Sequence, residues 1–190
     1  MIDTNKMVVE DYLINRFTMA ILPGENRYIT EVLELEQDLT VGKRPMDVID
    51  QSCRYFGSSY NGRKEGTKDL MGITHKPPIV IDPTNSIYFF PTTSSTRPHC
   101  AWLSHSFVKE YVGTKEDNTC ITFTNGKVIT LPMSVGSFEN QLFRTAQLRT
   151  IISSRIEQEQ RKINMLLFPK GEKEVSSFYE QMIREMNRFQ

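Results

Sequence analysis

The chain has 190 residues, and its 23 basic and 23 acidic side chains give a formal net charge of zero. Its length is typical of one folded domain, and its ordinary content of apolar and aromatic residues argues against a disordered chain. Three widely spaced cysteines, apolar runs too short to span a bilayer and a first segment without a signal-peptide pattern predict a cytoplasmic protein without disulfides.

Charge is distributed unevenly along the chain. Residues 1–51 carry five basic and ten acidic side chains, whereas residues 52–109 carry seven basic and three acidic ones together with all three histidines. Residues 110–190 are nearly balanced, with eleven basic and ten acidic side chains. A neutral chain with a positive middle segment can focus a positive field on one face while it stays soluble.

The first half of the chain predicts a hairpin followed by two helices. Tyr12–Leu22 and Tyr28–Leu35 are rich in strand formers and are separated by the turn residues Pro23–Asn26. Pro45 suits the first turn of a helix that places four residues on or near one face: Val48, Ile49, Ser52 and Cys53. A second helix is expected over about residues 58–70, where two interior glycines weaken it by about 1 kcal/mol each.

The middle of the chain predicts strands. The prolines in His75–Pro78 favour an extended turn, because a residue before proline avoids the helical region. Strands are expected over Ile79–Ile81, Ile87–Phe90 and Ala101–Val108. Asn125-Gly126 between Thr119–Thr124 and Lys127–Leu131 predicts a tight hairpin, since both turn residues tolerate positive φ.

After Pro132 the apolar period becomes helical. Ser137 is the predicted N-cap of a long helix that ends near Pro169. A further amphipathic helix is expected over residues 175–189, with an apolar stripe that suits either an intramolecular core or a subunit contact. Strands first and helices last predict an α+β fold, a single domain with a mainly antiparallel β-sheet core followed by C-terminal helices.

The segment SCRYFGSSYNGRKEGTKDLMGITHKPP combines cations, hydroxyls and glycines. Cations neutralise phosphates, small residues let the backbone approach, and hydroxyls add donors, so the segment favours nucleic-acid binding. A solvated face with structural aromatics is the alternative. The candidate DNA-binding residues are Arg54, Ser58, Ser59, Arg63, Lys64, His75 and Lys76.

A second candidate is PTTSSTRP, residues 91–98, in which hydroxyls and Arg97 stand between two prolines. Thr96 and Arg97 suit contact with a sugar-phosphate backbone. An exposed turn without a ligand is the alternative. The arginines of the long helix are better explained as a solvated face.

Catalysis and metal binding find little support in the sequence. Cys53 with a histidine base could act as a nucleophile, but an apolar helical pattern surrounds it and favours a core position. No phosphate-binding loop, zinc-protease, hydrolase or dinucleotide motif is present, and no zinc-type cysteine spacing occurs. We therefore expect no enzyme activity, no metal and no cofactor.

Several ordered blocks are similar to the bacterial competence transcription factor ComK family. They are SCRYFGSSYNGRKEGT, HKPPIVIDPTN, SSTRP, FTNGK, SFENQLFRTAQLRT and FPK, densest between about Arg44 and Thr150. The resemblance implies a cytoplasmic, nucleoid-associated activator of DNA-uptake genes. It implies oligomers that bind paired A/T-rich boxes of double-stranded promoter DNA, mainly through the minor groove and the phosphate backbone.

The resemblance also implies proteolysis by a Clp protease through an adaptor. The adaptor-docking residues would be Met165, Leu166, Leu167, Phe168, Pro169 and Lys170, and from the residues alone this apolar run suits either core or partner contact. We therefore divide the chain into a DNA-binding body, residues 1–163, and a helical segment for oligomerisation or adaptor docking, residues 164–190. The alternative function is a protein-binding module whose basic segment grips an acidic partner.

Overall fold

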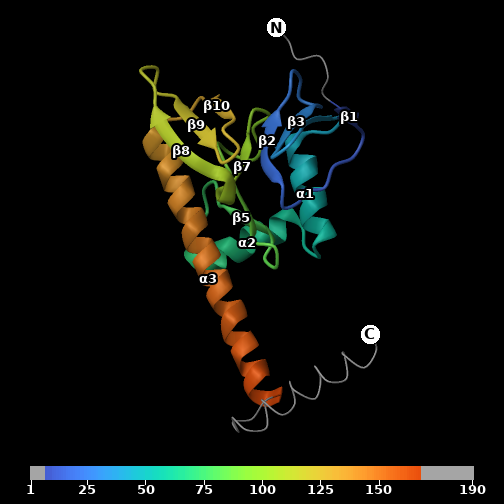
Figure 1. The fold of residues 1–190 in the computed structure, drawn as a ribbon, viewed down its shortest axis with the longest axis vertical. Coiled ribbons are helices and arrows are strands. Elements are labelled where there is room, and N and C mark those ends of the chain that lie inside the picture. The colour runs from blue at the N-terminus through green and yellow to red at the C-terminus, as the bar shows by residue number, and fades with distance from the viewer. Residues whose placement is uncertain (1–6, 168–190) are drawn as a thin grey trace, which may run out of the picture. The chain divides into compact units, whose positions relative to one another are not determined.

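A computed structural model describes residues 7–167 and has an α+β fold (Figure 1). A seven-stranded sheet has the order β1-β4-β3-β2-β7-β6-β5, and a three-stranded sheet has the order β10-β9-β8. Neighbouring strands are antiparallel except for the pair β1–β4. The predicted fold class, with its mainly antiparallel sheet, is confirmed.

The element bounds are as follows. The strands are β1 (Met7–Val9), β2 (Thr18–Pro23), β3 (Thr30–Glu34), β4 (Asp38–Val41), β5 (Ile79–Asp82), β6 (Ile87–Pro91), β7 (Trp102–Ser104), β8 (Val108–Gly113), β9 (Thr119–Phe123) and β10 (Val128–Leu131). The helices are α1 (Pro45–Tyr55), α2 (Tyr60–Met71) and α3 (Val135–Leu167), and His105–Phe107 form a 3₁₀ turn.

The chain divides into two compact units, Met1–Ile151 and Ile152–Gln190. Both sheets, α1, α2 and the first half of α3 belong to the first unit, which carries the candidate site. The predicted division at residues 163 and 164 stays a prediction. Within residues 7–167, no helix has the length and apolarity that crossing a membrane requires.

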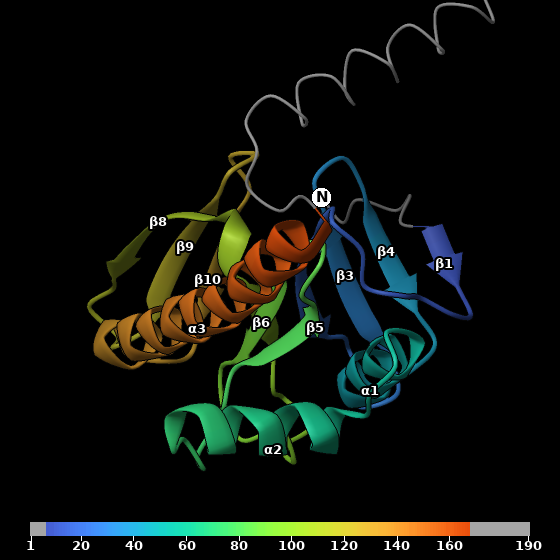
Figure 2. The same cartoon turned by 90° about the horizontal axis from the view of Figure 1, so that it is seen from below.

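The seven-stranded sheet is buried on both faces because its central strands alternate between two cores. Ile21 pairs with Trp102 and both belong to the core beneath α1 and α2, whereas their neighbours Ala20 and Leu103 pair in the core on the opposite face. Successive side chains of a strand point to opposite faces, so one pair of strands supplies both cores. Figure 2 shows α1 and α2 along the first of these faces.

The two short helices form where predicted. Pro45 occupies the first turn of α1, and the predicted face of that helix, Val48, Ile49, Ser52 and Cys53, is buried. Helix α2 ends at Gly72, whose φ of 69° is the left-handed conformation that glycine adopts without strain. Two interior glycines are tolerated because α2 is anchored at both ends and packs on β5.

The second core joins the three-stranded sheet and the first half of α3 to the main sheet. The ring of Phe138 in α3 packs 5.6 Å from Phe90 and 5.1 Å from Tyr111, measured between centroids. Gln141 Nε2 donates to the carbonyl oxygens of Pro91 at 2.7 Å and Lys76 at 3.1 Å. These contacts fix the segment before β5 and the end of β6 against the helix.

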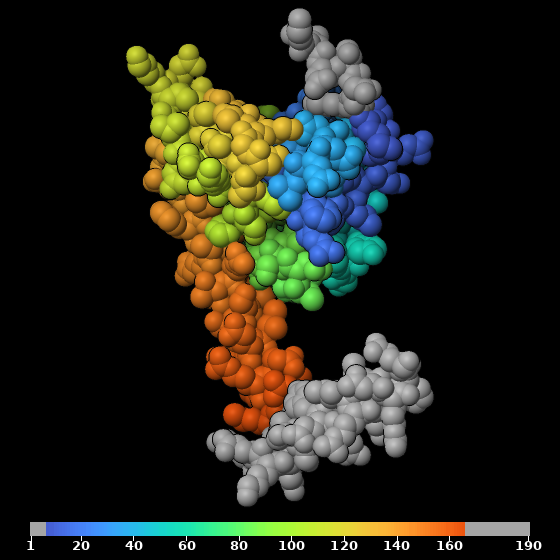
Figure 3. Space-filling view, viewed as in Figure 1, coloured from blue at the N-terminus to red at the C-terminus, as the bar shows by residue number. Residues whose placement is uncertain are grey.

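The β9–β10 hairpin also contacts the main sheet. Lys127 Nζ forms an ion pair with Asp38, and Asn125 Nδ2 donates to the carbonyl oxygen of Leu35 at 2.9 Å. In the space-filling view of Figure 3 the hairpin, in yellow, abuts the blue surface of the β3–β4 region. The predicted hairpin is confirmed, although among its turn residues only Gly126 takes a positive φ, 84°.

Besides the strand expected over Tyr12–Leu22, whose residues 12–17 lie outside β2, three details of the sequence prediction are wrong. Helix α3 begins at Val135 rather than after a cap at Ser137. Ser134 occupies the capping position, because its carbonyl accepts the first helical bond from Phe138 N at 3.0 Å and its Oγ accepts from Ser137 N at 3.4 Å. The predicted strand Ala101–Val108 is interrupted by the 3₁₀ turn that leads the chain from one sheet to the other.

The third detail is the backbone at Lys76. Its φ of 49° is left-handed instead of extended, and its carbonyl oxygen accepts the bond from Gln141. The contact with Gln141 therefore accompanies a left-handed backbone at Lys76, although the following proline favours an extended one. The predicted amphipathic helix over residues 175–189 lies outside the described residues.

Candidate nucleic-acid interface

The loop between β6 and β7 presents Arg97 at the surface. Thr92 N donates to Ala101 O at 2.9 Å and closes the loop at its base. Arg97 N donates to Ser94 O at 2.9 Å, and Arg97 O accepts from Cys100 N at 3.1 Å, so Arg97 stands between two consecutive turns. The loop is ordered by its own backbone, which leaves the exposed guanidinium of Arg97 available to a ligand.

The start of α2 supports this loop. Tyr60, the first residue of α2, forms a side-chain hydrogen bond with Ser95, and its ring meets Trp102 edge-on at 5.7 Å between centroids. Burial raises the pKa of Tyr60, and the bond with Ser95 opposes that rise. The hydroxyl-rich loop therefore lies against the corner where α1 passes into α2.

A pocket of about 300 Å³ lies beside the Arg97 loop and brings three arginines together. Arg27 comes from the β2–β3 turn, Arg44 from the residue before α1, and Arg97 from the loop. Among the described residues that line the pocket, none is acidic. The other lining residues are Pro45, Met46, Ser95, Thr96, Pro98, Cys100 and Trp102.

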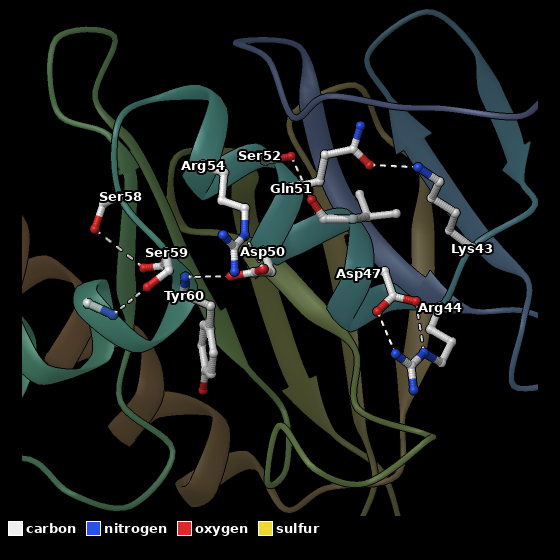
Figure 4. Close-up of polar contacts among 12 residues, drawn as sticks. Lys43, Arg44, Asp47, Asp50, Gln51, Ser52, Arg54, Ser58, Ser59 and Tyr60 are labelled. Carbon is white, nitrogen blue, oxygen red and sulfur yellow. Dashed lines mark hydrogen bonds and ion pairs between the residues drawn. The ribbon is translucent and has the colours of Figure 1, made fainter.

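The outer face of α1 carries balanced charges rather than a positive stripe (Figure 4). Arg44 forms two bonds with Asp47, at 2.8 and 2.7 Å, and the hydrogen bonds from Arg44 lower the pKa of that carboxyl group. Arg54 Nε donates to Asp50 at 2.7 Å. Burial raises the pKa of Asp50, but bonds from Arg54 and from the backbone N–H of Tyr60 outweigh it and lower the pKa. Arg54 thus reaches the surface already paired.

Three other predicted residues hold the corner between α1 and α2. Ser59 Oγ caps α2 by accepting from Gly62 N at 3.1 Å, and Ser58 Oγ donates to Ser59 O at 3.4 Å. Arg63 Nη2 donates to Phe56 O at 3.0 Å and to Ile81 O at 3.2 Å. Half-buried Arg63 therefore joins the corner to β5, and its contacts are those of a structural residue.

The remaining predicted cations are exposed. Lys64 and Lys68 stand four residues apart on the outer side of α2, where Glu65 and Asp69 are exposed as well. His75 and Lys76 are exposed in the segment before β5. Gln141 Nε2 donates to both Lys76 O and Pro91 O, which places the backbone of Lys76 near the base of the Arg97 loop.

Cys53 and His105 occupy desolvated positions. Cys53 is fully buried in the core beneath α1, and burial raises the pKa of its thiol to about 12. His105 lies between the two sheets, where burial and the charge of Arg149 lower its pKa. Within residues 7–167 no group of three or more histidine, cysteine, aspartate or glutamate side chains could hold a metal ion.

Comparison with known proteins identifies the family. A family model described as ComK protein matches residues 9–157. The chain belongs to the ComK family. A relative in Bacillus subtilis (strain 168), named Competence transcription factor, is 45% identical over 181 residues, which are 94% of each chain. No solved structure matches the chain.

For this ComK protein, the structure groups the predicted residues into three sets. Thr96 and Arg97 lie at the pocket, with the backbone of Lys76 near the base of their loop. Ser58, Ser59 and Arg63 are engaged in local structure, and Arg54 is paired with Asp50. Lys64 and His75 are exposed, and their side chains form no hydrogen bond or ion pair within the described part of the chain. Met165 is exposed near the end of α3, and Phe168–Lys170 lie outside the described residues.

Sequence reasoning missed Arg27 and Arg44. Arg27 follows an acidic turn and Arg44 precedes a proline, and both lie in the N-terminal segment with a net negative charge. The structure carries them to the Arg97 loop because β2 pairs with both β3 and β7. Sequence reasoning could have found these two arginines only by predicting that β2 pairs with both β3 and β7.

Proposed function

We propose that the chain is a transcriptional activator of competence genes that binds paired A/T-rich boxes through the minor groove and the phosphate backbone. The competence transcription factor from B. subtilis supports the general role. The single structural observation that carries the proposal is the exposed Arg97 on a narrow, hydroxyl-rich loop, flanked by two further arginines at one pocket. Such an activator acts in the cytoplasm at the nucleoid.

A loop arginine suits the minor groove better than α1 or α2 suits the major groove. A-tracts have a narrow and strongly negative minor groove that attracts inserted arginine. Reading the major groove requires side chains such as arginine or asparagine to be free on one helix face. The face of α1 carries Arg44 and Arg54 already paired with Asp47 and Asp50, so these two arginines are not free to read base edges.

In this arrangement Arg97 enters the groove, Thr96 donates to the backbone, and Lys64, Lys76 and His75 contact phosphates on either side. The experiment is fluorescence anisotropy with a duplex that carries paired A/T boxes and one of equal length in which G·C replaces A·T. We expect preference for the A/T duplex and a steep dependence on salt. Arg97→Ala should remove the preference, whereas Lys115→Ala, a matched loss of charge in the β8–β9 turn, should leave it. Equal and weak binding to both duplexes would favour the protein-binding module.

We also propose that the chain binds DNA as a dimer or higher oligomer and that Met165–Lys170 docks a Clp adaptor. Supporting the second point, Met165 is 66% exposed on α3, where an apolar side chain has no core to join within the described residues. Replacing Phe168 by alanine should slow adaptor-dependent degradation without changing DNA affinity. Degradation at an unchanged rate would exclude this segment as the docking site.

A further inference from the structure

We propose that the pocket beside the Arg97 loop binds a small phosphomonoester that carries a ring, such as a nucleoside monophosphate. This ligand site does not depend on the DNA-binding function proposed above. Only its effect on DNA binding rests on that function, because Arg97 belongs to both. The site is assembled from a charged rim, a helix start and an apolar wall.

The rim brings together arginines from three separate segments, of which Arg27 and Arg97 form no ion pair within the described residues and Arg44 is paired with Asp47. Arg27 stacks over the ring of Tyr28 at 4.7 Å, and Arg44 is oriented by its two bonds to Asp47. The side chain of Arg97 forms no hydrogen bond or ion pair within the described residues. A planar guanidinium forms paired, charge-assisted bonds with phosphate oxygens. A phosphate beside Arg27 and Arg97 would give Arg97 a partner, and Arg44, paired with Asp47, would add a hydrogen-bond donor rather than net charge.

The start of α1 adds a second attraction for an anion. Pro45 and Met46 line the pocket and are the first residues of this eleven-residue helix. The residue before the helix, Arg44, makes no side-chain capping bond. Pro45 has no N–H, and Asp47 N donates to Arg44 O at 2.9 Å, so the N–H of Met46 is the donor that this helix start offers an anion at the positive end of the helix dipole.

The opposite wall of the pocket is apolar and contains Trp102. Trp102 is fully buried, and its Nε1 has no hydrogen-bond acceptor within residues 7–167. Met46, Pro98 and Cys100 complete a surface against which a ring can pack. A volume of about 300 Å³ lies at the low end for small-molecule sites and suits one mononucleotide rather than a dinucleotide.

Trp102 is the single tryptophan of the chain and therefore reports directly on this pocket. The experiment titrates the full-length protein, without DNA, with AMP while tryptophan fluorescence is recorded, and calorimetry measures the same binding. Adenosine and inorganic phosphate are the comparison ligands. We expect saturable binding of AMP, with adenosine and phosphate each at least about tenfold weaker, because each lacks one half of the recognised group.

The variants locate the site. Arg97→Ala should weaken AMP binding by at least about tenfold, Arg97→Lys should recover part of that loss, and Lys115→Ala should bind AMP like the parent protein. The proposal is overturned by the absence of saturable AMP binding in both measurements, by equal affinity for AMP and inorganic phosphate, or by an unchanged affinity in Arg97→Ala.

A final comparison separates this site from the DNA-binding function. Saturating AMP should lower the salt slope of binding to the A/T duplex by about one unit, since Arg97 is then occupied. If no duplex binds while AMP does, the DNA-binding proposal fails and the ligand site stands.

Discussion

Replacing Arg63 and Lys64 one at a time separates a structural arginine from a surface lysine on the same helix. Arg63 donates to the carbonyl oxygens of Phe56 and Ile81, and its Nε is buried without a partner in the described residues. Hydrogen bonds to a charged group contribute about 1.5–3 kcal/mol each, and burying the unpaired N–H costs about 1–3 kcal/mol. Two such bonds together contribute about 4.5 kcal/mol at the middle of this range, and removing the unpaired N–H recovers about 2 kcal/mol, so the net loss for Arg63→Ala is about 2.5 kcal/mol.

For a chain of this length, that loss should lower Tm by roughly 5–10 °C. Lys64 is exposed, so Lys64→Ala should change the unfolding free energy by no more than about 0.5 kcal/mol. The effects on binding to the A/T duplex should be the opposite of those on stability. Lys64→Ala should lower the salt slope of binding by about one unit, whereas folded Arg63→Ala should keep the slope of the parent protein.

Urea denaturation, thermal melting and anisotropy at several salt concentrations measure the two effects. Arg63→Lys is the matched control, because it keeps the charge but loses the planar fork that spans two carbonyl oxygens. A variant Arg63→Ala with unchanged Tm and a reduced salt slope would refute the structural role and return Arg63 to the DNA surface.

Two further predictions concern buried titratable groups. Burial raises the pKa of Glu34, but hydrogen bonds from Tyr12, Gln37 and Asn15 outweigh this effect and lower the pKa. The ionised carboxylate therefore stabilises the fold at pH values above the ordinary pKa of glutamate, and this contribution is lost as the pH falls through the lowered pKa. Tyr12→Phe should therefore destabilise the protein most near neutral pH, with the difference from the parent narrowing in acid; a difference constant in urea denaturation down to pH about 3 would contradict this. Because burial raises the pKa of Cys53 to about 12, its thiol should resist alkylation in the folded protein, and Cys53→Ser should lower stability without changing DNA affinity. Mass spectrometry after iodoacetamide treatment checks the first point, and rapid labelling of Cys53 would contradict burial.

Elements with local signals could be predicted from the sequence. The β9–β10 hairpin is specified by Asn125-Gly126, and α1 by Pro45 and its buried face, because a few neighbouring residues determine each of them. The errors occur where a tertiary contact decides. Lys76 takes a left-handed φ while its carbonyl binds Gln141, 65 residues later.

The candidate site was less accessible to sequence reasoning than the fold. Arg97 could be identified from its hydroxyl-rich surroundings, but Arg27 and Arg44 join it only through the strand order of the main sheet. The hydrogen bonds of Arg63 to two carbonyl oxygens were equally unpredictable, because the composition of a basic segment is the same whether its arginines are paired or free. Composition identifies charge, and only the fold shows which charges remain available.

Binding to a duplex in which inosine·cytosine replaces A·T in both boxes tests the central claim most directly. Inosine lacks the 2-amino group of guanine, so I·C presents the minor-groove pattern of A·T and the major-groove pattern of G·C. If the protein reads the minor groove, its affinity for the I·C duplex should stay close to that for A·T and well above that for G·C. Affinity for I·C as weak as for G·C would contradict minor-groove recognition.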